Sequence, residues 1–294
     1  MKKLLYLLSA VVLLVSCNSS HNKKEKGLTI TDTFQRVVTI DKTPARIVSA
    51  SPAVTEILFA LGKGKQLAGR TDHCVYPPQV AAIPSIGGII DPNLETIASL
   101  NPDLVIASTH FKKEMAEKIQ QMNIPVVVLV SQESFDGSYA MIRQIADIVD
   151  AKEKGDSIIR TMQKTVSEIE AKVKRIKEKP SVYYVIGFGK SGDFTAGGNT
   201  FINNMINMAG GVNIAQDVTG WSYSLEKLIQ KDPDIILIHK GNKALFENTP
   251  SYKNLKAVKN NSVFEVDNNL FELTGPRLSE GLETLFSILH PEIK

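Results

Sequence analysis

The sequence predicts an α/β protein of two Rossmann-like lobes, each built on a parallel sheet, joined by one long rigid α-helix. Residues 94–108 and 225–239 carry nearly the same phrase: Leu-Glu opens a short helix, Pro-Asp makes a turn, and an apolar run forms a strand buried on both faces. Strands and helices alternate on either side of a middle segment that has no strand pattern. Because solenoid repeats run only about 20–50 residues, this much longer period indicates a duplicated domain. Two lobes imply a cleft between them.

The N-terminus has the pattern of a bacterial export signal. Two lysines precede an apolar run over residues 4–15, which is shorter than the roughly 20 residues that a membrane span needs. Residues 1–16 are therefore predicted to be a signal peptide. The small residue before Cys17 resembles the lipobox of bacterial lipoproteins, which implies cleavage before Cys17 and lipid attachment to it, with residues 17–29 as a polar tether. An ordinary secretory signal is the alternative.

The charge and the cysteine content indicate which partners and which sources of stability the chain can have. The formal net charge of +3 falls by two when the signal peptide and its lysines are removed, so nothing indicates nucleic acid as a partner. With Cys17 lipidated, Cys74 has no partner for an intrachain disulfide, despite the exported setting. Stability must then come from hydrophobic cores, and the remaining chain is long enough for two of them.

The N-terminal lobe is predicted over residues 30–150. Residues 45–51 form a strand, and the helix that follows has Pro52 at its first position and Gly62 at its end, where these residue types are favoured. Helices and strands then alternate, with strands at residues 104–107 and 126–130 and helices at residues 112–122 and 139–149.

Residues 151–179 are predicted to form the connecting helix. Apolar residues recur there at spacings of three and four, at Ile158, Met162, Val166, Ile169, Val173 and Ile176. At 1.5 Å per residue, a helix of this length spans on the order of 40 Å, more than the width of one lobe. A coiled-coil dimerisation helix is the alternative, but the stripe covers only about three heptads, so we expect a monomer.

The C-terminal lobe is predicted over residues 180–294, starting at Pro180, which ends the connecting helix. Its elements are a strand at residues 181–188, a helix at 200–209, the second copy of the repeat, a strand at 262–266 and a final helix at 277–289.

Several sequence segments of the chain resemble those of a known family. Cobalamin-binding proteins of ABC importers are closely similar at residues 44–62, Tyr76-Pro77-Pro78, Asn93-Leu94-Glu95 and residues 101–107. The wider family also includes binders of haem and ferric siderophores. The resemblance runs from about residue 30 to residue 289 and includes the long connecting helix.

The resemblance implies an extracytoplasmic binding protein that captures a metal chelate, with cobalamin or another corrinoid as the first choice. The protein would deliver this ligand to an ABC permease dimer and its ATPase. It would do no chemistry itself and would hold no resident cofactor or metal. Together with Cys17, the resemblance implies a lipid anchor in a bacterial membrane, with the lobes facing the periplasm or the cell exterior.

Glu95 and Glu226 hold the same place in the two copies of the repeat. The resemblance implies that each pairs with arginines of one permease subunit, because charge pairs at a rim guide docking. A local role is the alternative, since an acid in the first turn of a helix stabilises it by about 0.3–1 kcal/mol.

Four residues are predicted to reach the cleft at the carboxyl ends of the strands, where open α/β sheets bind ligands. They are the sole tryptophan, Trp221, together with Phe188, Phe271 and Glu272. Flat aromatic faces suit a flat, conjugated macrocycle, and cobalamin binders carry a tryptophan near the position of Trp221. Core packing is the alternative for Trp221 and Phe188.

The chain also departs from the cobalamin pattern. Family tryptophan positions fall near Ile89 and at Ser108, and a pocket arginine position falls at Leu273, which leaves haem and ferric siderophores open as ligands. His73 matches a tyrosine that contacts cobalamin in the family. We therefore expect His73 to face the cleft, as a hydrogen-bond donor or a metal ligand, with a structural role as the alternative.

Two further classes of function rank behind the chelate binder. His110 and His239 follow comparable strands and could converge with His73 on a free metal or on haem iron, although no short histidine spacing supports such a site. An enzyme would need a recognisable motif, but the chain lacks a dinucleotide fingerprint, a nucleophile elbow and a Cys-x-x-Cys pair. No base can be named for Cys74 as a lone nucleophile. The chain is predicted not to be an enzyme.

Overall fold

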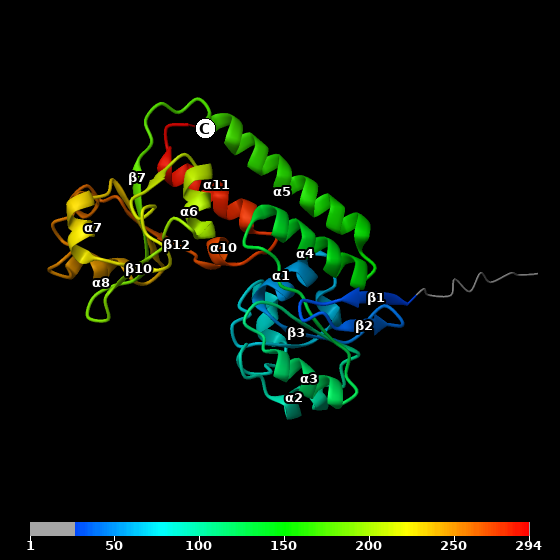
Figure 1. Cartoon of the computed structure of the whole chain (residues 1–294). Coiled ribbons are helices and arrows are strands. Elements are labelled where there is room, and N and C mark those ends of the chain that lie inside the picture. The colour runs from blue at the N-terminus through cyan, green and yellow to red at the C-terminus, as the bar shows by residue number, and fades with distance from the viewer. Residues whose placement is uncertain (1–26, 294) are drawn as a thin grey trace, which may run out of the picture.

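The computed structural model describes residues 27–293. The predicted signal peptide, Cys17 and most of the predicted tether lie outside these residues. Figure 1 shows two α/β lobes, with the long helix α5 (Lys152–Val173) running along one side of the molecule. No helix in the described part of the chain is long and apolar enough to span a membrane.

The first lobe is built on a four-stranded, fully parallel sheet with strand order β4-β3-β5-β6. The strands are β3 (Ile47–Ala50), β4 (Leu67–Arg70), β5 (Leu104–Ala107) and β6 (Val126–Val128). Every residue of β3, β5 and β6 is buried, because helices cover both faces of the sheet. These helices are α1 (Pro52–Ala60) and α4 (Phe135–Ile148) on one face and α2 (Leu94–Ser99) and α3 (Lys113–Gln121) on the other.

Smaller elements complete this lobe. A two-stranded antiparallel hairpin precedes the sheet, and two short 3₁₀ helices follow α1 and β4; they are β1 (Leu28–Thr31), β2 (Val37–Ile40), η1 (Gly64–Gln66) and η2 (Pro78–Ala82).

Helix α1 begins and ends as its sequence predicts. Pro52 occupies the first helical turn, and Gly62 follows the C-cap with a φ of +78°, a left-handed conformation that glycine adopts without steric cost. Because α1 starts directly after β3, it carries Glu56 to the boundary with the second lobe.

Helix α5 is shorter than the predicted segment of residues 151–179. Its 22 residues span about 33 Å at 1.5 Å per residue. The chain then tightens, because Arg175 and Ile176 donate to carbonyls only three residues earlier. Ile176 still packs against the core, so the apolar stripe outlasts the α-helix. Helix α5 packs on α4 of the first lobe and on α6 (Phe201–Met208) and α11 (Leu278–Leu289) of the second.

The second lobe has a mixed sheet with strand order β10-β8-β7-β11-β12, and β9 also pairs with β7. Its strands are β7 (Ser181–Gly187), β8 (Asp193–Thr195), β9 (Val212–Asn213), β10 (Ser222–Tyr223), β11 (Ile235–His239) and β12 (Val263–Val266). β9, β7, β11 and β12 are parallel, whereas β8 and β10 form an antiparallel extension. Its remaining helices are α7 (Leu225–Lys231), α8 (Lys243–Asn248), α9 (Lys256–Lys259) and α10 (Asn269–Glu272).

The repeated phrase has the same structural role in both lobes. In the first lobe it forms α2 and β5, and β5 lies beside β3. In the second lobe it forms α7 and β11, and β11 lies beside β7. The sequence repeat is therefore a repeat of helix, turn and strand at matching places in two sheets.

Candidate ligand-binding cleft

Three adjoining cavities lie at the boundary between the lobes; two are lined by both lobes and the third by the first lobe alone. Their volumes are about 340, 120 and 400 Å³, and His110 lines all three. The first two also share residues of both lobes, namely Glu133, Glu272, Leu273 and Thr274. Because these cavities share lining residues, they lie side by side, and together they are called the cleft.

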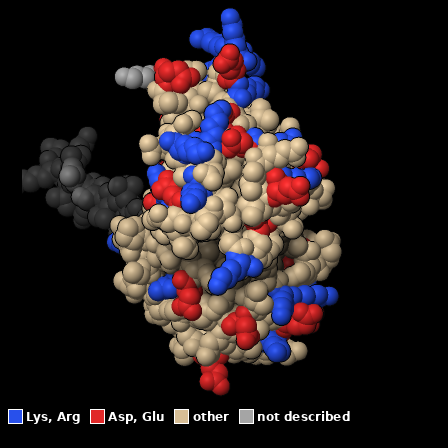
Figure 2. All heavy atoms as spheres, turned by 90° about the vertical axis from the view of Figure 1, so that its left-hand side faces the viewer, with Lys and Arg blue, Asp and Glu red and all other residues tan. Residues whose placement is uncertain are grey.

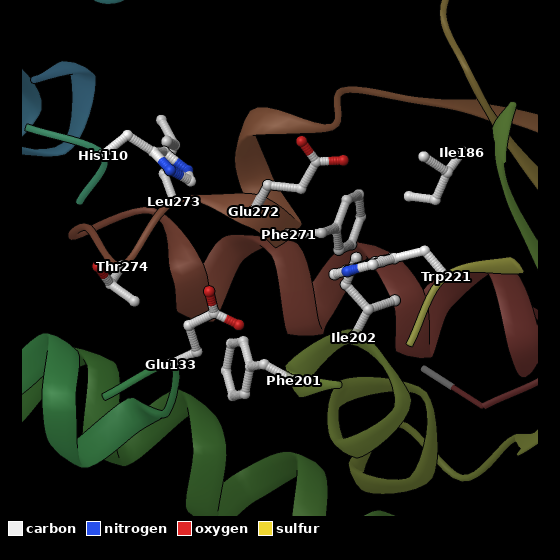
Figure 3. Close-up of a pocket in the computed structure, with 10 residues that line it drawn as sticks. All are labelled: His110, Glu133, Ile186, Phe201, Ile202, Trp221, Phe271, Glu272, Leu273 and Thr274. Atoms are coloured by element: carbon white, nitrogen blue, oxygen red, sulfur yellow. The ribbon is translucent and has the colours of Figure 1, made fainter. Parts of the chain in front are cut away.

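One wall of the cleft is apolar and aromatic (Figure 3). The side chains that form it are Ile186 from the end of β7, Phe201 and Ile202 from α6, Trp221 from the segment before β10, and Phe271 from α10. Trp221 is 46% exposed, so it is not a core residue. Phe271 is only 1% exposed and packs edge-on against Tyr184, with ring centroids 6.1 Å apart. The structure thus brings two of the predicted aromatic residues to the same cavity.

Phe188 lies elsewhere, which corrects its expected position. Its ring packs against Phe246 and Tyr252, with centroids 5.2 and 5.9 Å away, in a separate core cluster of the second lobe. The pairing of β7 with β8 shifts register between Val185 and Gly187. Such an irregularity interrupts the alternation of side chains, so the spacing from Ile186 does not bring Phe188 into the cleft.

A polar cluster surrounds Glu272 on the second-lobe side of the cleft. The Nε2 atom of His239 lies 3.3 Å from Oε1 of Glu272 and 3.4 Å from the hydroxyl of Tyr184, which donates to Glu272 at 3.4 Å. Burial, and then the nearby Glu272 carboxylate, raises the pKa of Tyr184 well above its usual range. The phenol therefore stays protonated and holds Glu272 at the cavity wall.

The predicted histidines are divided between the lobes. His73 is exposed and lines the third cavity together with His110, Ile89 and Asp91. His110 follows β5 in a left-handed conformation with a φ of +71°. His239 belongs to the opposite lobe and contacts Glu272. Within residues 27–293 no group of three or more His, Cys, Asp or Glu side chains is placed to hold a metal ion.

A buried ion pair joins the lobes beside the cleft. Arg277, at the start of α11, donates two hydrogen bonds to Glu56 of α1, at 2.9 Å from Nε and 2.6 Å from Nη2. The side chains are only 14% and 5% exposed, and the guanidinium stacks on Tyr76 at 3.8 Å. Burial raises the pKa of Glu56, and Arg277 opposes this rise. A second buried link runs from the hydroxyl of Ser138 to the carbonyl of Gly275 at 3.1 Å.

Glu95 and Glu226 lie away from the cleft walls, each exposed in the first turn of its helix. The helices α2 and α7 are capped by Asn93 and Ser224, whose side chains accept from backbone N–H groups at 2.9 and 3.4 Å. Figure 1 shows α2 and α7 at the ends of their lobes that lie far from α5. Neither glutamate forms an ion pair with any other residue in the described range.

Sequence reasoning missed several residues that shape the cleft. Tyr184 is hidden in the apolar run of β7, and Glu133 lies in a polar loop after β6. Phe201 and Ile202 were predicted only as part of a helix. The one usable signal was position, and it applies to Glu133, which follows a strand, and to Phe201 and Ile202, which begin a helix, but not to Tyr184 in the middle of β7.

Comparisons with known proteins agree with this architecture. The model of the family described as "Periplasmic binding protein" matches residues 47–270. An uncharacterised ABC transporter substrate-binding lipoprotein of Bacillus subtilis, YvrC, is 33% identical, over 97% of this chain and 96% of that protein. A cobalamin-binding protein of Halobacterium salinarum is 27% identical, over 88% of this chain and 73% of that protein. The apo structure of the periplasmic heme-binding protein RhuT from Roseiflexus is 27% identical with a TM-score of 0.76, covering 85% of this chain and 99% of that one.

Proposed function

The chain belongs to the periplasmic binding protein family, and from this premise we propose that it captures a corrinoid and delivers it to the permease of an ABC importer. It is a substrate-binding protein of an ABC transporter, of the type that binds cobalamin, haem or siderophores, and not an enzyme. Its family works outside the cytoplasm. The identity of the ligand, the lipid anchor and the docking contacts are the parts that we propose.

The observation that carries the corrinoid proposal is the aromatic and apolar wall of the cleft. Trp221 presents an exposed ring to one cavity, and the largely buried Phe201 and Phe271 form the apolar wall around it together with two isoleucines. Such a wall suits the broad face of a macrocycle. Polar groups of Glu133, Glu272 and Thr274 stand at its edge, where the amide arms of a corrinoid would find hydrogen-bond acceptors. The cobalamin-binding relative supports the same ligand class.

Haem is the second candidate. His73 and His110 line one cavity, and imidazole is a common axial ligand of haem iron. The likeness to a heme-binding protein supports this alternative. A ferric siderophore remains a third ligand class to test against the other two.

The protein is proposed to act from a lipid anchor at Cys17, since its relative YvrC is named a lipoprotein. Glu95 and Glu226 are proposed to dock on the permease. Their support is that both carboxylates are exposed, lie at matching positions in the two lobes and have no ion-pair partner within residues 27–293.

Calorimetric titration of the chain after Cys17 tests the ligand directly, with cyanocobalamin, cobinamide, haemin and a ferric catecholate in parallel. Tight binding of both corrinoids supports a carrier that recognises the ring. Binding of haemin or the catecholate alone would replace the corrinoid proposal with a role in iron acquisition, with His73 as the first residue to change.

A further inference from the structure

The walls of the cleft are acidic. Among the described residues that line the three cavities are the carboxylates Asp91, Glu133 and Glu272, and no lysine or arginine is among them. Figure 2 shows that the hollow in this face is walled mainly by uncharged residues, with basic side chains at its edge or beyond. Apart from histidines, the described residues that line the three cavities therefore include no basic side chain.

Glu133 and Glu272 come from different lobes and line the same two cavities. Glu133 lies in the segment between β6 and α4, and Glu272 ends α10, as Figure 3 shows. Within residues 27–293 neither pairs with a lysine or an arginine, and Glu272 instead contacts Tyr184 and His239. No lysine or arginine among the described residues therefore neutralises their charge.

A ligand with carboxylates at its periphery would be disfavoured in this setting. Its anionic groups would lose water without gaining a cationic partner, and they would face the fixed carboxylates of the walls. Amide N–H groups and cationic centres would instead be attracted, because hydrogen bonds to a carboxylate are among the stronger ones in proteins. Repulsion of the wrong ligand is a recognised source of specificity.

We propose that Glu133 and Glu272 make the cleft select metal chelates by charge, so that it takes a neutral or cationic, amide-bearing chelate over one that carries carboxylates. This inference rests on the proposed role as a chelate carrier. Two side chains, one from each lobe, would select the ligand by its charge. This selection would act on any macrocycle that fits the apolar wall.

Two ligand pairs separate charge from ring type. Dicyanocobinamide and dicyanocobyrinic acid share the corrin ring but carry amides or carboxylates, and haemin dimethyl ester and haemin differ in the same sense. Affinities are measured at pH 8, where imidazoles are generally uncharged. The wild type should bind the neutral member of the pair more tightly. Each of Glu133→Gln and Glu272→Gln should reduce this preference by roughly threefold to tenfold, as expected for charges several ångströms apart near a protein surface.

The matched control is Glu283→Gln, which removes an exposed carboxylate of α11 outside the three cavities and should leave the preference unchanged. Equal affinity for the neutral and carboxylate forms in the wild type overturns charge selection. A preference that survives in the Glu133→Gln/Glu272→Gln double variant overturns its assignment to these residues. If corrinoids fail to bind, the corrinoid proposal falls, and the haemin pair still decides this inference. Failure of all four chelates to bind overturns both.

Discussion

Replacing Arg277 by alanine should destabilise the protein in a pH-dependent way. The substitution leaves Glu56, which is 5% exposed, without the two hydrogen bonds that Arg277 donates to it. Removing one partner of a buried ion pair generally costs about 3–5 kcal/mol. Because the Arg277 side chain is itself 14% exposed and water can enter the space it leaves, we expect the lower end, about 3 kcal/mol at pH 8.

The sign of the pH dependence follows from Glu56. Burial raises the pKa of Glu56 above its ordinary value of 4.5, and the opposing effect of Arg277 is lost in the variant. A carboxyl group whose pKa is raised by folding favours the folded state at low pH, and this contribution disappears as the pH rises through the folded-state pKa. The deficit of Arg277→Ala should therefore shrink as the pH falls from 8 to 5, by at most about 1.4 kcal/mol per pH unit.

Urea unfolding followed by circular dichroism at several pH values measures this deficit. The control replaces both partners by apolar residues, Glu56→Leu with Arg277→Met, and should recover at least half of the lost stability because no buried charge is left unpaired. A loss below about 1 kcal/mol at pH 8, or an equal loss at pH 5 and pH 8, would refute the assignment of a buried charge pair between the lobes.

Three other predictions concern the cleft and its partner. Cyanocobalamin should quench the fluorescence of Trp221, the only tryptophan of the chain. Trp221→Ala should weaken cyanocobalamin binding by roughly tenfold to a hundredfold, as expected for a lost aromatic contact. The control Leu245→Ala, at a site that is 64% exposed, should leave this affinity unchanged. Reversing the charge of Glu95 and Glu226 should impair ligand uptake in cells. The affinity for the ligand in solution should stay within about twofold, because neither residue lines the cleft. A loss of ligand affinity would instead place these glutamates at the ligand. Small-angle scattering with and without ligand should give nearly the same radius of gyration, and marked compaction would contradict a preformed cleft.

The sequence predicted those parts of the fold whose signal is local and strong. Strands such as β5 are apolar at every position because both faces are covered, and α1 is bounded by Pro52 and Gly62. The two- and three-residue strands β8, β9 and β10 were missed because they are too short to show alternation. The antiparallel edge of the second sheet depends on these strands, so it could not be inferred.

The site was only partly predictable for a different reason. Trp221 could be expected from its residue type and the family resemblance, and Phe271 from its residue type and its place after a strand, and both line the cleft. The position of Phe188 depends on a register shift in β7, which arises from pairing with β8 and leaves no mark in the sequence. Glu133 carries no motif at all. Its importance appears only when the lobes are assembled and its carboxylate meets the same cavity as Glu272.

The way the lobes are joined determines how this protein can be selective. Helix α5 packs on α4 in one lobe and on α6 and α11 in the other, while the pair of Glu56 and Arg277 ties the lobes together beside the cleft. Two links of different chemistry therefore hold the lobes together, and we expect them to limit closure around a ligand. A carrier that closes widely can gain selectivity by completing its site only around the correct ligand, but a preformed cleft must discriminate through the walls it already presents. Here those walls are aromatic on one side and acidic at the edge, so ring shape and peripheral charge are the properties on which discrimination can act.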